Sequence, residues 1–397
     1  MSVGVCVINR NGIALAADSA GTFNGNEMFY NSMNKVFSLS KHNVVGAIIY
    51  GNLSIYNVSV EQIIKEFSLY MDSNTEINDF FEILPLFQEF IKINNTYYKF
   101  DKAEIGYCQD WIKRLSVEWG NKIKNIIDSP NFETEANKVI SELGNIVTSS
   151  IKIDGYDISK YINSQYIEFY DKIINIVVPE IKNHIDIKNQ LWDYICLFFN
   201  LSLKDEIKSR TGLFFSGYGK NDAFPKYIEI ELYTVINGQA KFRISNIFEE
   251  ENNQGQIKPL AQDDVILTFC RGISNTFINY IPQKVGELIT QKIDELPNSF
   301  SNDQKNDLRE TLLNCKSELA DAISAQIQNN NVNPIFKSVD LLPLSEMAFL
   351  AENLVNITSL KRLYSLDGRQ QTVGGPTDVA IISKGDGFVW VKNKTII

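Results

Sequence analysis

Two short apolar runs near the N-terminus constrain the fold of this chain more than any other feature. Residues 3–9 and 13–17 are almost entirely apolar, and Arg10-Asn11-Gly12 separates them. An Asn-Gly pair between two such runs is a strong signal for a tight hairpin. Strands without polar alternation are typical of sheets that are buried on both faces. The sequence therefore predicts a sheet that needs further layers on both of its sides.

Further short apolar runs with turn residues between them predict more strands, at residues 35–39, 43–50, 213–219, 227–236, 241–247, 378–383 and 388–392. Because such pairs lie near both ends of the chain and helical segments flank them, we expect two sheets face to face with helices outside. The predicted fold class is α/β (α+β), as a four-layer αββα sandwich of two antiparallel sheets with large helical insertions.

Helical periodicity predicts two large additions to this sandwich. Apolar residues recur at helical spacing through residues 76–208, and again in a helical extension around 276–340. Within the extension, Ser301 and Gln304 have capping-box spacing, and the Asn-rich residues 329–334 predict a loop. Amphipathic helices are also predicted after the fourth strand, over 59–70, and before the last strand pair, over 344–363. The expected organisation is 2–75 for the first part of the sandwich, 76–208 for the helical insertion, and 209–397 for the remainder with its helical extension.

Composition excludes several classes of function. The formal charge of −10 and a pI of about 5.0 oppose binding to nucleic acid. No apolar run of about 18 residues and no basic leader with an apolar core are present, so we expect a cytoplasmic protein that makes no contact with membranes. Five scattered cysteines without a CxxC pair, and only two histidines, predict reduced buried thiols, no metal site and no Ser-His-Asp triad. We expect no cofactor.

A series of residues in the first fifty positions resembles the proteasome β-subunit family of N-terminal nucleophile (Ntn) hydrolases. After Met1 the chain runs through Ser2 and a strand to Asn11-Gly12, then Ala16-Ala17-Asp18-Ser19, Asn34-Lys35-Val36 and Tyr50-Gly51. The order of elements after residue 340 is also similar to the family, with Gly374-Gly375 between the last helix and the last strand pair. The resemblance leaves the helical additions unmatched.

The resemblance implies a catalytic set. Ser2 would be the nucleophile and, once Met1 is removed, its α-amine would be the base; a free α-amine has a pKa of about 7.7–8.0, which suits this role. Lys35 would stabilise the alkoxide by its charge, Asp18 would hold Lys35, and Gly51 would donate its backbone N–H to the oxyanion. Thr22, Ile49 and Leu53 correspond by offset to substrate-binding positions.

Two of these assignments have a simpler alternative. Asp18 and Lys35 could form an inert surface ion pair, and Gly51 could serve only to turn the chain. The family also carries an aspartate and a serine ahead of the glycine pair, where this sequence has Gln370 and Val373. These two residues put the orientation of the Ser2 amine in question.

Three functions follow from the resemblance. The first is a peptide hydrolase that acts on peptide or protein substrates, as a homo-oligomer, with a separate ATP-dependent unfoldase because the chain has no GxxxxGK[ST] loop. The second is a catalytically inactive subunit that acts as a structural or partner-binding protein. The third is an acylase for small amides, because the same nucleophile serves many leaving groups.

Overall fold

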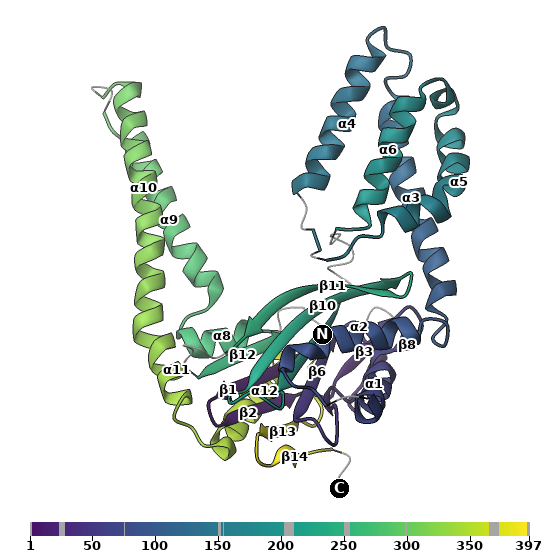
Figure 1. Cartoon of the computed structure of the whole chain (residues 1–397). Helices are drawn as coiled ribbons and strands as arrows, with labels where there is room; N and C mark the ends of the chain where they lie inside the picture. The colour runs from purple at the N-terminus through teal and green to yellow at the C-terminus, as the bar shows by residue number, and fades with distance from the viewer. Residues whose placement is uncertain are drawn as a thin grey trace. The chain divides into compact units, whose positions relative to one another are not determined.

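The computed structural model describes residues 2–23, 28–74, 76–149, 152–153, 155–201, 210–249, 255–297, 300–364 and 373–394 (Figure 1). The chain is a mixed α/β protein with two antiparallel five-stranded sheets. It divides into two compact units. The sheet unit comprises residues 1–50, 215–227 and 248–397, and the helical unit comprises residues 51–214 and 228–247.

The first sheet lies wholly in the sheet unit and begins with the predicted hairpin. Its strand order is β12 (Gln256–Ala261), β1 (Val3–Asn9), β2 (Gly12–Ala17), β13 (Asp378–Ser383) and β14 (Gly387–Lys392). β1 and β2 pair in the register Asn9↔Gly12, which confirms the Asn-Gly turn. The sequence did not predict β12, which contains Pro259. This strand lies at the sheet edge, where a residue without an N–H is tolerated.

The second sheet has the order β11 (Gln239–Phe248), β10 (Lys226–Ile236), β9 (Thr211–Gly217), β6 (Val45–Gly51) and β5 (Val36–Ser38). These strands agree with the predicted ones to within a few residues at each end. Two short pairs were not predicted, β3 (Gly21–Phe23) with β4 (Met28–Tyr30), and β7 (Ser54–Ile55) with β8 (Val58–Ser59). Strands of two or three residues have no periodicity that a sequence pattern can detect.

Within the sheet unit, the first sheet is covered on both faces. Alternate residues of β1, Val3, Val5 and Val7, pack in one core cluster with α8 (Asp264–Arg271), α11 (Asn333–Val339) and α12 (Leu344–Tyr364). On the other face, a Cβ at Gly4 would lie 3.3 Å from Ile48 of β6, and a Cβ at Gly46 would lie 2.8 Å from Ile382 of β13. The glycines therefore let β6 approach the first sheet closely, as the burial of both sheet faces requires.

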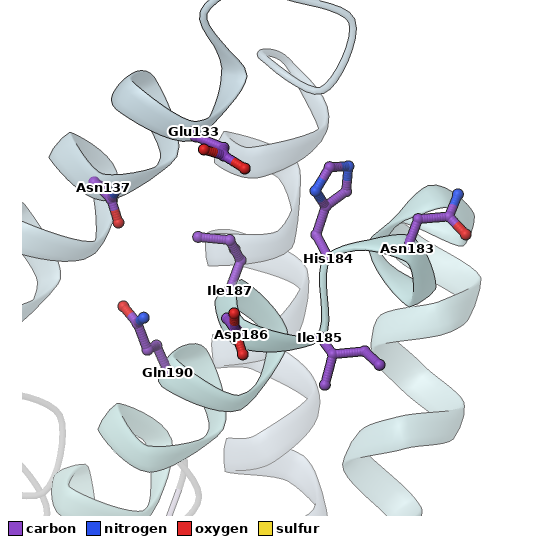
Figure 2. Close-up of a pocket in the computed structure, with 8 residues that line it drawn as sticks. All are labelled: Glu133, Asn137, Asn183, His184, Ile185, Asp186, Ile187 and Gln190. Atoms are coloured by element: carbon purple, nitrogen blue, oxygen red, sulfur yellow. The ribbon is translucent and has the colours of Figure 1, made fainter.

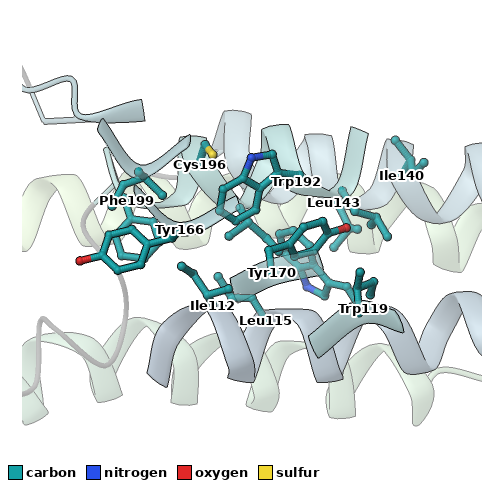
Figure 3. Packing of buried hydrophobic residues seen from close by; sticks show 14 of the residues in the cluster. Ile112, Leu115, Trp119, Ile140, Leu143, Tyr166, Tyr170, Trp192, Cys196 and Phe199 are labelled. Carbon is teal, nitrogen blue, oxygen red and sulfur yellow. The ribbon is translucent and has the colours of Figure 1, made fainter. Parts of the chain in front are cut away.

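The helical unit has an aromatic core of its own (Figure 3). Trp119, Tyr170 and Trp192 belong to this core, and the last two rings stack at 4.8 Å between centroids. The described helices of this unit are α1 (Val60–Asn74), α2 (Ile83–Ile93), α3 (Phe100–Lys124), α4 (Phe132–Ser149), α5 (Ser159–Val177) and α6 (Ile185–Phe198), with the short η2 (Phe80–Glu82) and η3 (Pro179–Asn183).

Between α8 and α11, the chain of the sheet unit forms a helical hairpin. It consists of α9 (Asn275–Asp294) and α10 (Asn302–Ile327), which lie side by side (Figure 1). The predicted capping box is confirmed, because the Ser301 hydroxyl accepts from Gln304 N and the Gln304 side chain accepts from Ser301 N.

The predicted loop at 329–334 is wrong. The chain stays helical through a π-helical turn at Gln328–Val332 and enters α11 directly. Pro334 is the second residue of α11, so its missing N–H falls directly after the π-helical turn.

Candidate active site

The start of β1 and the end of β2 meet at one edge of the first sheet. Because Gly4 pairs with Ala17, the residues that precede β1 lie beside those that follow β2. The backbone N of Val3 donates to Asp18 Oδ1 at 3.0 Å, and Asp18 N donates to Val3 O at 3.2 Å. Ser2 is only 4% exposed, and its carbonyl accepts from Gln262 N at 3.2 Å. The first described residue is therefore held by backbone contacts on both sides.

Asp18 and Lys35 form a buried ion pair. Lys35 Nζ lies 2.6 Å from Asp18 Oδ1, and the two side chains are 1% and 0% exposed. The Lys35 carbonyl accepts from Ile49 N at 2.9 Å, so β6 holds the lysine backbone. The surface alternative is wrong, because both charges have left water and each depends on the other for compensation.

The Asp18 carboxylate connects several parts of the site. Its Oδ1 accepts from Val3 N and Lys35 Nζ, while its Oδ2 accepts from Ala20 N at 3.3 Å and from Gly374 N at 3.1 Å. Four donors on two oxygens leave the carboxylate with one orientation. Sequence reasoning placed Asp18 beside Lys35 but missed the Gly374 amide as a ligand of the carboxylate.

Val373 and Gln370 are the two residues ahead of the glycine pair that differ from the family. Val373 is fully buried in the core cluster under α12, so it acts as a packing residue. Gln370 lies outside the described residues. Ser19 N donates to Gly374 O at 3.2 Å, and the Ser19 hydroxyl donates to Pro376 O at 2.6 Å. Backbone contacts therefore fasten the Gly374 segment to the end of β2.

A second buried ion pair, which the sequence did not reveal, lies near Lys35. Asp378 and Lys394 pair through Asp378 Oδ2 and Lys394 Nζ, with side chains 4% and 7% exposed. Burial lowers the pKa of Lys35; Asp18 opposes this shift, Lys394 adds to it, and Asp378 opposes it. Asp378 pairs with Ala17 in the register of β13 and β2, which brings the second pair to the same end of the sheet.

The remaining predicted positions have different surroundings. Gly51 has a φ of +80°, and a Cβ there would lie 2.5 Å from the Arg210 carbonyl oxygen, so the backbone alone requires glycine. Ile49 is fully buried, and the half-buried Leu53 accepts from Val60 N through its carbonyl. Thr22 pairs with Phe29 between β3 and β4. Ser2, Asp18, Lys35 and Ile49 belong to the sheet unit, whereas Gly51 and Leu53 belong to the helical unit.

The surroundings of His184 and of the cysteines indicate structural roles. A pocket of about 610 Å³ in the helical unit is lined by Glu133, His184, Asp186 and neighbouring residues (Figure 2). The His184 ring packs on Phe132 at 4.3 Å, as a structural histidine does. In the described ranges, no group of His, Cys, Asp and Glu could hold a metal ion. Four thiols are buried as predicted, but Cys315 is exposed on α10, so that part of the prediction is wrong.

Two further findings bear on identity. None of the described helices is long and apolar enough to cross a membrane. The chain matches no protein-family model and no curated protein.

Proposed function

We propose that this protein is a cytoplasmic Ntn hydrolase of the proteasome type that cleaves peptide bonds, with Ser2 as its nucleophile after removal of Met1. One observation carries the proposal: Asp18 Oδ1 contacts both Lys35 Nζ and the backbone N of Val3, the residue that follows Ser2. A single carboxylate oxygen thus joins a buried cation to the start of the chain. The proposed architecture is the four-layer αββα sandwich, with helices on the outer face of the second sheet as its fourth layer.

The reaction would proceed through an acyl-enzyme. The Ser2 hydroxyl attacks the substrate carbonyl while the Ser2 α-amine takes the hydroxyl proton. The same amine then gives this proton to the leaving amine as the peptide C–N bond breaks. Water, deprotonated by the α-amine, hydrolyses the ester and restores the hydroxyl. Lys35 stabilises the negative charge that develops on the Ser2 oxygen during the attack.

The mechanism predicts that activity rises and then falls as the pH increases. Activity should rise as the Ser2 amine loses its proton, with a reference pKa of about 7.7–8.0. It should fall again where Lys35 becomes neutral, because a neutral amine no longer stabilises an alkoxide. Since burial lowers the Lys35 pKa below its usual 10.5, the falling limb should lie at a lower pH than for an exposed lysine.

The test is covalent modification of Ser2. Protein without Met1 is treated with a hydroxyl-directed acylating inhibitor, and intact mass with peptide mapping locates the adduct. We expect one adduct on Ser2, none with Ser2→Ala, and a rate at least about 100-fold lower with Lys35→Met. Lys41→Met, which changes an exposed lysine, is the matched control and should react like the parent protein.

Two results would redirect the proposal. Folded protein with a free Ser2 amine that neither reacts nor cleaves peptides would contradict it and favour an inactive, partner-binding subunit. An acylated Ser2 together with turnover of small amides but not of peptides would favour an acylase. If peptides are cleaved, addition of an ATP-dependent unfoldase should extend the activity to folded proteins.

A further inference from the structure

The peptide group between Ser2 and Val3 is bound on both of its edges. Its N–H, from Val3, donates to Asp18 Oδ1 at 3.0 Å, and its carbonyl, from Ser2, accepts from Gln262 N at 3.2 Å. Because a peptide group is planar and rigid, two hydrogen bonds on opposite edges fix its orientation. The Cα of Ser2 lies in this plane, so the two bonds also fix the point from which the Ser2 hydroxyl and α-amine project.

The carbonyl edge leads to a charged group that the proposed mechanism does not use. Gln262 is 8% exposed, and its side-chain Oε1 accepts from Arg362 Nε at 2.8 Å. Arg362 lies in the last turn of α12 with a side chain that is 7% exposed, and its Nη2 donates to Asp264 Oδ1 at 2.5 Å. The planar guanidinium thus binds Gln262 and Asp264 through two different nitrogens. A continuous series of contacts runs from Asp264 at the start of α8 to the Ser2 carbonyl.

The backbone just before Gln262 has an unfavourable conformation. Ala261 is the last residue of β12 and pairs with Val3 of β1. Its φ of +65° lies in the left-handed region, which residues other than glycine and asparagine rarely adopt. Such a conformation persists only where surrounding contacts hold it. Here the next residue, Gln262, is held by Ser2 through its backbone and by Arg362 through its side chain.

Lys361, the neighbour of Arg362, provides a matched comparison. It also pairs with Asp264, at 3.3 Å from Nζ to Oδ2, but its side chain is 48% exposed. Two adjacent cations therefore share one carboxylate, and the buried one of the two also binds Gln262. All of these residues belong to the sheet unit.

We propose that Arg362 is a positioning residue for Ser2, which holds the carbonyl edge of the Ser2–Val3 peptide group through Gln262, as Asp18 holds the N–H edge. This inference rests on the proposed function, because positioning affects a rate only if Ser2 reacts. Misplacement of a reacting group by about 1 Å can cost about 100-fold in rate. Since Arg362 acts through one intervening residue, we expect a loss of about 10-fold when its side chain is replaced.

The first test separates binding from reaction at Ser2. Arg362→Met removes both hydrogen bonds of the guanidinium, while Asp264 keeps Lys361 as its partner. The maximal rate of Ser2 acylation should fall about 10-fold at an unchanged inhibition constant, because the lost contact acts on the reaction and not on inhibitor binding. Lys361→Met is the control and should react like the parent protein. Circular dichroism should show both variants folded.

The second test examines the route through Gln262. Gln262→Met removes the Oε1 acceptor but keeps the backbone N–H that binds Ser2. It should lower the acylation rate as Arg362→Met does, and the double variant should be no slower than either single variant, because the two changes break the same contact. Rate losses that multiply in the double variant would show that Arg362 does not act through Gln262 and would overturn the proposal.

The third test does not depend on activity. Hydrogen exchange of single backbone amides, followed by NMR, should show the Gln262 N–H exchanging about 10-fold faster in Arg362→Met and unchanged in Lys361→Met. If the parent protein does not react with the inhibitor, the proposed function fails, and this exchange rate alone decides whether Arg362 holds the Ser2 peptide group. An acylation rate in Arg362→Met equal to that of a reactive parent protein, or unchanged exchange at Gln262, overturns the proposal.

Discussion

The two helical additions to the sheets differ in how they bury their apolar residues. The helices of the helical unit share one core, in which residues such as Trp119, Tyr170 and Ile174 are almost completely buried. In the hairpin, Pro282 and Ile293 are the buried residues among the described side chains of α9 and α10. Two helices have only one mutual face, so each apolar stripe stays half-exposed, whereas several helices can enclose a common core.

The hairpin shows the consequence at its tip. Leu288, Ile289, Phe300, Leu308 and Leu312 line an apolar pocket of about 480 Å³ that stays open between the two helices. Long helices with good caps are therefore enough to form the hairpin. A third packing surface would be needed to exclude water from its apolar side chains. Stability should be high in the helical unit and low along the hairpin.

The largest expected effect is truncation of an aromatic side chain in the helical unit. Trp192→Ala removes a ring that is 4% exposed and stacks on Tyr170, so local stability should fall by about 3–5 kcal/mol. Hydrogen exchange measured by mass spectrometry can follow α5 and α6 separately from the sheets. A loss below about 1 kcal/mol would mean that this core is loosely packed. It would contradict the contrast between the helical unit and the hairpin.

The second largest expected effect is a loss of stability of the helical unit at alkaline pH. Burial raises the pKa of Cys108 and Cys196 to about 12, so the unfolded thiols, with pKa values near 9, lose their protons first. Stability from these groups is full below pH 9 and falls as the pH rises towards 12, by about 1–2 kcal/mol per thiol at pH 10.5. Exchange rates of α3 and α6 should rise accordingly. A Cys108→Ala, Cys196→Ala variant should reduce this dependence, and an unchanged slope would contradict it.

A smaller effect is expected at the hairpin cap. Ser301→Ala removes the capping box at the start of α10 and should cost about 1 kcal/mol, seen as faster exchange in the first turns of that helix. Ser317→Ala is the control, because Ser317 lies in the exposed middle of the same helix. Equal effects of the two variants would show that the cap does not hold the hairpin.

The smallest effect is expected for an apolar truncation in the hairpin. Leu288→Ala changes a side chain that is 48% exposed, so it should cost less than about 1 kcal/mol. The measurement is the same exchange experiment on α9. A cost comparable to that of Trp192→Ala would show that another surface covers the hairpin and would remove the contrast between the two additions.

The candidate site could be predicted only in part. Ser2, Asp18 and Lys35 follow from short segments next to predicted strands, and the structure brings Asp18 and Lys35 into direct contact. The bond from Gly374 N to Asp18 and the ion pair beside Lys35 could not be predicted, because no local pattern relates Asp18 to residues more than 350 positions away. For Gly51, the structure supplies a backbone reason for glycine, while its oxyanion role remains a prediction.

The sequence by itself determined the elements whose causes are local. The Asn11-Gly12 turn, the helical periodicity and the Ser301 cap depend on neighbours within a few residues. They can therefore be predicted from the order of residues alone. Tertiary structure alone decided that β12 would extend the first sheet, that Asn-rich residues would stay helical, and that Asp378 and Lys394 would lie near Lys35. Burial and charge act through space, and their partners are chosen only when distant segments pack together.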